Sequence, residues 1–117
     1  MDFFELIFSL PIPPLTYSWS PDRGRIIPGM LVTAEVKKSI QHGIVLRKAA
    51  HHPAGPVKEI LDIVLEKPIM NHSLLSLLQW MAGYYLVPEG SVVKHLFPLE
   101  YFLKPRAERS RKGNKDT

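Results

Sequence analysis

The residues that decide the fold lie late in the chain, at positions 71–85, and read NHSLLSLLQWMAGYY. Apolar side chains recur there at the spacing that places them along one face of an α-helix. Asn71 or Ser73 can cap the free N–H groups of the first turn. We therefore expect the main helix of the protein here. We expect it to bury its leucines, Trp80 and one or both of Tyr84 and Tyr85.

A second, shorter helix is expected after a turn. Pro88 cannot continue the first helix, because it lacks an N–H group and its ring clashes with the preceding turn. The residues around it turn the chain, and residues 92–96 then have the pattern of a short helical run. The two helices together form a helical block over residues 72–97, and we expect a smaller β half to pack against it.

The β half is predicted from short segments rich in aromatic and β-branched residues. Proline and glycine turns separate these segments, and residues 37–39 are the expected tip of a hairpin. Gly43 indicates a bulge or a close backbone approach. Residues 57–65 suit either a strand or a short helix, and their β-branched side chains favour the strand. The four clearer strands are residues 3–8, 15–20, 31–36 and 40–46.

These patterns predict an α+β domain. A small curled or barrel-like antiparallel sheet would cover about residues 3–65, with the helical block on one side of it.

The basic character of the chain is concentrated at its end. The net charge is +4, but residues 104–117 hold six of the 15 basic residues and only two of the 11 acidic ones. They show no apolar period, which predicts a disordered basic tail after a folded domain of residues 1–103. Within the folded part, residues 20–58 are rich in Lys and Arg. A local basic half suits a small anionic ligand better than a long run of phosphates.

Several function classes lack the residues that they need. No phosphate-binding loop and no nucleophile elbow occur, so we expect no enzymatic activity from this chain alone. The five histidines do not have metal-ligand spacing and there is no cysteine, so we expect no metal, cofactor or disulfide. Apolar runs fall short of the ~20 residues that span a bilayer. Asp2 and Glu5 argue against a signal peptide, and a cytoplasmic location is the expectation.

The segment Thr-Tyr-Ser-Trp, which ends at Trp19, is the first candidate for a binding site. The rings of Tyr17 and Trp19 can stack on bases, or they can face the core beside Leu15, since alternation puts all three on one side of a strand. Lys37 and Lys58 also suit a solvated hairpin tip and a strand-edge charge. Taken singly, these residues leave both readings open.

A set of short motifs occurs in order between residues 4 and 99. They are Leu10-Pro-Ile-Pro13, Pro28-Gly29, Gly43-Ile-Val45, Val57-Lys-Glu-Ile60, Pro68-Ile69 and, most specific, the spaced series Trp80, Ala82, Tyr84, Tyr85, Gly90, Val92, Leu96 and Pro98. In this order and spacing the motifs resemble the N-terminal 3′-DNA-binding domain of the primosomal replication-restart helicase PriA (primosomal protein N′).

The resemblance implies a domain that holds the free 3′ end of a DNA strand, such as a nascent leading strand at a stalled fork, for replication restart. In that family an ATP-dependent helicase portion and a zinc-binding portion follow on the same polypeptide. Other primosome proteins and single-strand-binding proteins are further candidate partners. No membrane association is implied.

The same resemblance implies the site residues. The terminal-nucleotide pocket of the family corresponds to Tyr17, Ser18 and Trp19, and its lysine corresponds to Lys58. Ser18 stands where the family has an aspartate, and residues 35–37, ending in Lys37, stand where it often has Pro-Phe-Gly. We therefore expect one nucleotide to stack on Tyr17 or Trp19, Ser18 to bond the base or the 3′-hydroxyl, and the two lysines to hold the last phosphate.

Two other functions remain open. The chain could bind single strands generally through its basic tail, or it could be a protein–protein interaction module that keeps only the scaffold. Unlike end capture, neither of these functions requires the predicted pocket to hold a nucleotide.

Overall fold

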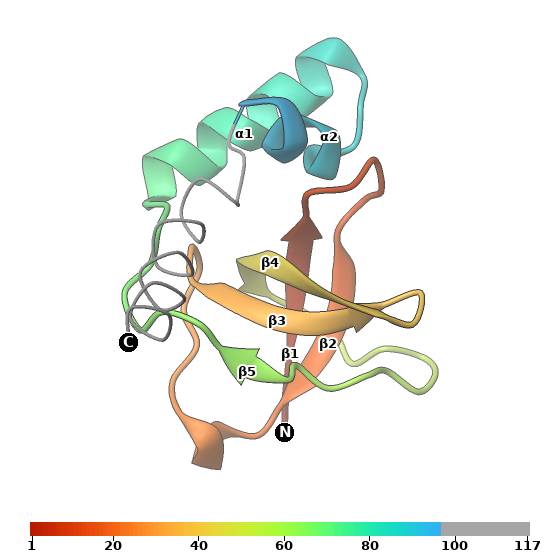
Figure 1. The fold of residues 1–117 in the computed structure, drawn as a ribbon, viewed down its shortest axis with the longest axis vertical. Coiled ribbons are helices and arrows are strands. Elements are labelled where there is room, and N and C mark those ends of the chain that lie inside the picture. Colours follow the sequence, from red (N-terminus) through yellow and green to blue (C-terminus); the bar gives the residue numbers. More distant parts are fainter. Residues whose placement is uncertain (97–117) are drawn as a thin grey trace, which may run out of the picture.

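The computed structural model describes residues 1–96, which form an α+β domain (Figure 1). The fold class predicted above is confirmed. The predicted tail, residues 104–117, and the last residue of the predicted helical block lie outside the described residues. The elements are β1 (Asp2–Phe8), β2 (Leu15–Trp19), the single 3₁₀ turn η1 (Pro21–Arg23), β3 (Leu31–Val36), β4 (Ser39–Lys48), β5 (Asp62–Ile63), α1 (His72–Tyr85) and α2 (Glu89–Leu96).

The five strands form one antiparallel sheet in the order β2-β1-β4-β3-β5, curled into a half-barrel. A register shift between Glu5 and Leu6 interrupts the pairing of β1 with β4, and such an irregularity bends a strand. The curl brings the two edges of the sheet together, because Ser18 in β2 forms an isolated bridge with Glu59, just before β5. The chain around residue 59 therefore nearly closes the half-barrel.

The hairpin of β3 and β4 is confirmed with its predicted tip. Val36 pairs with Ser39 across the turn, and Lys37 and Lys38 adopt φ angles of 50° and 69°. Two left-handed residues give the tight turn whose twist matches that of paired strands. In β4, a Cβ on Gly43 would lie 2.9 Å from a ring carbon of Phe8. The close approach predicted at this glycine is therefore to an aromatic ring.

The strand predicted over residues 57–65 is much shorter in the structure. Only Asp62 and Ile63 form a ladder with β3. Residues 58–60 bond to the other edge, β2, because the Ser18 N–H donates to the Lys58 carbonyl and the Ile60 N–H donates to the Ser18 carbonyl. From Leu61, whose N–H donates to the Thr33 carbonyl, the segment lies along β3. The segment crosses from one edge of the sheet to the other, and it therefore cannot form one continuous ladder.

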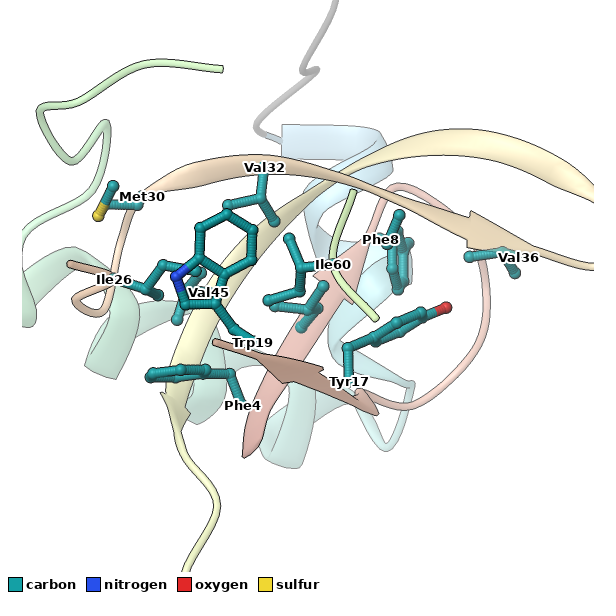
Figure 2. Close-up of a cluster of buried hydrophobic side chains, with 12 residues drawn as sticks. Phe4, Phe8, Tyr17, Trp19, Ile26, Met30, Val32, Val36, Val45 and Ile60 are labelled. Carbon is teal, nitrogen blue, oxygen red and sulfur yellow. The ribbon is translucent and has the colours of Figure 1, made fainter. Parts of the chain in front are cut away.

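Two apolar cores hold the layers together. One lies inside the half-barrel (Figure 2), and the other lies between the sheet and the helices. Successive strand residues supply opposite cores, because alternate side chains point to opposite faces. The half-barrel core includes Phe4, Phe8, Tyr17, Trp19, Val45 and Ile60, and the helix-side core includes Ile7, Leu31, Ile44, Leu75, Leu78 and Val93.

Helix α1 starts as predicted. The Asn71 side chain accepts a 2.8 Å hydrogen bond from the Leu74 N–H, so Asn71, one of the two residues expected for this role, is the N-cap. The aromatic residues of this helix contradict the prediction that they are buried. Trp80, Tyr84 and Tyr85 are 61%, 66% and 62% exposed. The sheet covers only the side of α1 that carries residues such as Leu78, so residues on the other side of the helix stay in solvent.

Helix α2 begins at Glu89, three positions before the predicted start at residue 92. α1 has already ended at Tyr85, and Leu86 takes a left-handed conformation with φ of 56°. Pro88 then directly precedes α2. A Cβ on Gly90 would collide with the carbonyl oxygens of Leu10 and Phe8, so the start of α2 packs directly on the chain leaving β1.

Candidate nucleic-acid interface

A hollow of about 430 Å³ lies where the hairpin tip, β2 and residues 56–58 meet. This volume is within the range that holds a small ligand. Its walls are mostly apolar, and three charged side chains lie among them. The charged residues are Glu35, Lys37 and Lys58, and the wall also includes Ile12, Leu15, Tyr17, Val36 and Val57. Three predicted site residues, Tyr17, Lys37 and Lys58, are therefore brought together.

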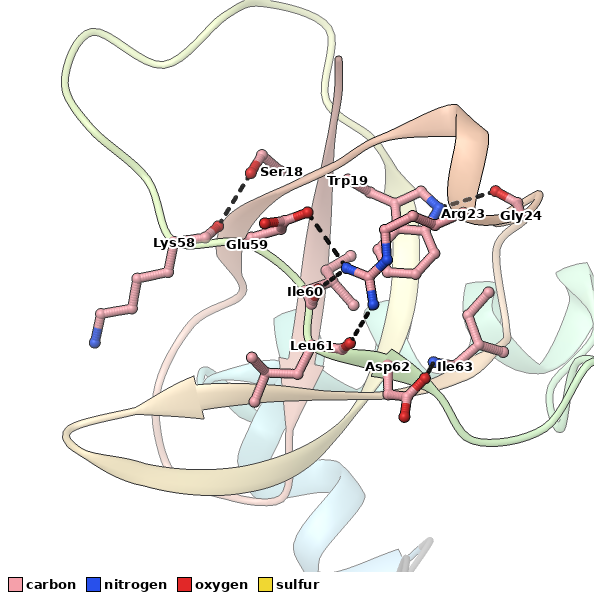
Figure 3. A network of polar contacts seen from close by, with 10 residues as sticks. All are labelled: Ser18, Trp19, Arg23, Gly24, Lys58, Glu59, Ile60, Leu61, Asp62 and Ile63. Carbon is pink, nitrogen blue, oxygen red and sulfur yellow. Dashed lines mark hydrogen bonds and ion pairs between the residues drawn. The ribbon is translucent and has the colours of Figure 1, made fainter.

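Lys58 is positioned by the closure of the half-barrel. Its carbonyl oxygen accepts a 2.9 Å hydrogen bond from the Ser18 N–H, which ties its backbone to β2. Its side chain extends away from the polar network around Arg23 (Figure 3). The ammonium nitrogen lies 3.8 Å from a carboxylate oxygen of Glu35, and both side chains are about half exposed. An ion pair this exposed is weak, so Lys58 can exchange Glu35 for a phosphate.

Tyr17 is among the residues that line the hollow, but its ring is buried. The residue is 4% exposed, and its ring meets Phe8 edge-on at 5.7 Å between centroids. Its hydroxyl donates a 2.6 Å hydrogen bond to the Glu35 carbonyl oxygen. Burial, and then the negative charge of Glu35, raise the pKa of Tyr17 above its ordinary value of 10. Stacking of a base on this ring, expected from the sequence, has no support in this geometry.

Trp19 is also unavailable for stacking. It is 2% exposed, and its Nε1–H donates a 2.9 Å hydrogen bond to the Gly24 carbonyl oxygen. In Figure 2 it is separated from Tyr17 by Ile60, and it does not line the hollow. The alternative in which both rings face the core with Leu15 describes this strand correctly.

Ser18 supports the site without lining it. Its side chain is buried, and its Oγ lies 3.5 Å from the Lys58 carbonyl oxygen, at the limit of a hydrogen bond (Figure 3). Its backbone bonds to residues 58 and 60 hold the closing segment against β2. The prediction that its hydroxyl contacts a base or a 3′-hydroxyl has no support in this geometry, because the side chain is turned away from the hollow.

Glu35 is the charged residue of the hollow that sequence reasoning overlooked. From the sequence alone, Glu35 is expected only to form part of the turn at residues 35–37. Its side chain is 43% exposed beside Lys58, which is 23 positions away in the sequence. Strand alternation in β3 could have flagged it, since its neighbours Ala34 and Val36 are buried and residue 35 must point the other way.

In the described part of the chain we find neither a candidate metal site nor a candidate membrane-spanning helix. Among residues 1–96, no group of three or more His, Asp or Glu side chains is placed to hold a metal ion. None of the described helices combines the length and the apolar character that crossing a membrane requires.

The curled sheet, the helical block and the lysine-rimmed hollow together define a small α+β domain with a candidate binding site. Residues 5–98 match the family of the 3′-DNA-binding domain (3′BD) of PriA. The match covers most of the chain, so the protein belongs to this family, and the resemblance seen in the sequence motifs is confirmed. The family is a DNA-binding domain and not a catalytic one. No curated protein matches the chain.

Proposed function

We propose that the hollow captures the 3′-terminal nucleotide of a DNA strand. The observation that carries the proposal is the convergence of Lys37 and Lys58 on one small hollow, from a hairpin tip and from the closing segment of the half-barrel. Two ammonium groups at one site suit one or two phosphates, and apolar walls suit a base. Membership of the 3′-DNA-binding family supports DNA as the ligand.

The terminal nucleotide would be held differently from the way the sequence suggested. Because the two aromatic rings belong to the core, the base would pack against the apolar wall that includes Ile12, Leu15 and Val57. Lys58 and Lys37 would bind the last internucleotide phosphate. Few phosphates are contacted in such a site, so the affinity should be modest and should depend only weakly on salt.

End capture is tested by comparing a linear oligonucleotide with a closed circular strand of the same sequence, by competition in fluorescence anisotropy. The linear strand should compete much better, because a circle offers no terminus. Equal competition by the two strands would show that the protein binds along the strand and would contradict end capture.

The role of the hollow is tested with matched lysine variants. Lys58→Ala and Lys37→Ala should each weaken binding about tenfold, since a hydrogen bond to a charged group contributes about 1.5 kcal/mol. Lys38→Ala is the control, because Lys38 neighbours Lys37 at the same tip and does not line the hollow. An equal loss in all three variants would indicate general attraction to phosphate.

We also propose the wider role that the family suggests. The captured end would be that of a nascent leading strand at a stalled fork, and a cytoplasmic protein with a helicase portion and primosome partners would use it for replication restart. A fork with a 3′ end at its branch point should compete better than the same fork without that strand. Equal competition would restrict the function to free ends.

The basic tail provides the second candidate function, general binding of single strands. Six basic residues among residues 104–117 are the observation in its favour. Deleting these residues should only weaken binding if the hollow captures the end, and should abolish it if the tail is the binding element. If no oligonucleotide binds at all, an interaction module is favoured, with the exposed aromatic side chains of α1 as its surface.

A further inference from the structure

We infer that the carboxylate of Glu35 makes the hollow select a terminal 3′-hydroxyl over a terminal 3′-phosphate. The inference rests on the proposed function and names the group that sets its specificity. Glu35 lines the hollow together with both lysines. It is the acidic residue of that lining, and its side chain is 43% exposed, so its oxygens are open to a ligand.

The backbone of Glu35 is held on two sides. Its carbonyl oxygen accepts the hydrogen bond from the Tyr17 hydroxyl at 2.6 Å, and its strand position pairs with Ile40 across the hairpin. Its carboxylate in turn reaches to 3.8 Å from the Lys58 ammonium. The backbone therefore places the Glu35 carboxylate within reach of the cation that would bind the last internucleotide phosphate.

The net charge of the hollow can balance one phosphodiester, but it cannot also balance a terminal phosphate. Two lysines and one glutamate leave a net charge of +1, which a single phosphodiester balances. A 3′-phosphate adds a charge of about −1.5 to −2 beside the carboxylate. Like charges placed together in a binding site repel each other, and this repulsion weakens binding. A 3′-hydroxyl instead can donate a hydrogen bond to the carboxylate, which only accepts.

The other polar groups near the site cannot supply this discrimination. The Ser18 side chain is buried, with its Oγ directed at the Lys58 carbonyl oxygen. Thr16 lines the hollow, but its hydroxyl is neutral and both donates and accepts, so it favours neither terminus by charge. Selection against the phosphate therefore depends on Glu35.

The test compares dissociation constants for two oligonucleotides that differ only at their ends, one with a 3′-hydroxyl and one with a 3′-phosphate. The wild-type protein should bind the hydroxyl end about two- to fivefold more tightly, which is the range for a half-exposed charge contact. Glu35→Gln should bring the ratio of the two constants close to one. Release of Lys58 from its carboxylate partner affects both oligonucleotides and cancels in that ratio.

Glu59→Gln is the matched control. Glu59 also pairs with a cation at the surface, Arg23 at 3.3 Å, and it directly follows Lys58, but it does not line the hollow. This variant removes the same charge and should keep the wild-type ratio. A Glu35→Gln protein that keeps the wild-type ratio, or a Glu59→Gln protein that loses it equally, would overturn the inference.

The outcomes separate this inference from the proposed function. If the linear strand outcompetes the circle but the two termini bind equally to the wild-type protein, end capture stands and the role of Glu35 is wrong. If the circle competes as well as the linear strand, the proposed function fails, whatever the effect of Glu35→Gln.

Discussion

The guanidinium carbon of Arg23 lies 4.3 Å from the centroid of the Trp19 ring. A cation at this distance from a ring face is attracted by the π-electrons. The same guanidinium donates hydrogen bonds to the carbonyl oxygens of Ile60 and Leu61, at 3.3 and 2.7 Å (Figure 3). Arg23 therefore covers Trp19 and also attaches the closing segment, which carries Lys58, to the half-barrel.

Replacing Arg23 should loosen that attachment. Arg23→Ala removes the contact with Trp19, the two hydrogen bonds to carbonyl oxygens and the exposed ion pair with Glu59, so we expect a loss of about 1–2 kcal/mol in the free energy of unfolding. Binding of a linear oligonucleotide should weaken as well, because Lys58 is less firmly positioned. Denaturant unfolding followed by circular dichroism measures the first effect. Arg25→Ala, an exposed neighbour, should leave stability within about 0.5 kcal/mol, and an equal loss there would contradict the assignment.

The hydroxyl of Tyr17 should matter for stability and for its dependence on high pH. Tyr17→Phe loses the hydrogen bond to the Glu35 carbonyl, which should cost about 1 kcal/mol at neutral pH. Because the pKa of Tyr17 is raised in the folded state, the unfolded chain loses this proton first as the pH rises above 10. Its contribution to stability is complete below pH 10 and is lost as the pH rises through the folded pKa.

Unfolding free energies measured across that alkaline range check the effect. The wild-type protein should lose stability more steeply than Tyr17→Phe above pH 10. Parallel curves for the two proteins would show that the hydroxyl titrates alike in the folded and unfolded states.

His42 should destabilise the fold in acid. It lies on β4 opposite Thr33, and burial lowers its pKa below the ordinary value of 6.5. Below pH 6.5 the unfolded chain takes up the proton more readily, so stability is complete above that value and is lost as the pH falls through the folded pKa. His42→Gln should flatten the pH profile of the unfolding free energy over this interval. An unchanged slope in the variant would assign the acid sensitivity to other groups.

The two sides of α1 should respond differently to truncation. Leu78 is fully buried, so Leu78→Ala should cost about 2–5 kcal/mol of stability. Trp80 is the larger residue, but it is 61% exposed, and Trp80→Ala should cost well under 1 kcal/mol. Thermal or denaturant unfolding distinguishes the two. A severe loss in Trp80→Ala would mean that this ring is covered in solution.

Local patterns in the sequence determined most of the fold. The strand at Leu31–Val36, the turn at Lys37 and Lys38, and the Asn71 cap were all predicted where they occur. Each depends on interactions between residues close together in the chain: alternation, turn conformation, and a side chain bonded to an N–H three residues on. The motif order also determined the family, which is a property of the sequence itself.

The tertiary structure alone decided which face of each element is covered. Alternation placed Tyr17 and Trp19 on one side of β2, but only the curl of the sheet made that side the core. In the same way, helical spacing could not show that the sheet reaches only one side of α1 and leaves Trp80 in solvent. The pairing of Glu35 with Lys58 likewise depends on closure of the half-barrel at Ser18, because that long-range contact brings two distant charges to one hollow.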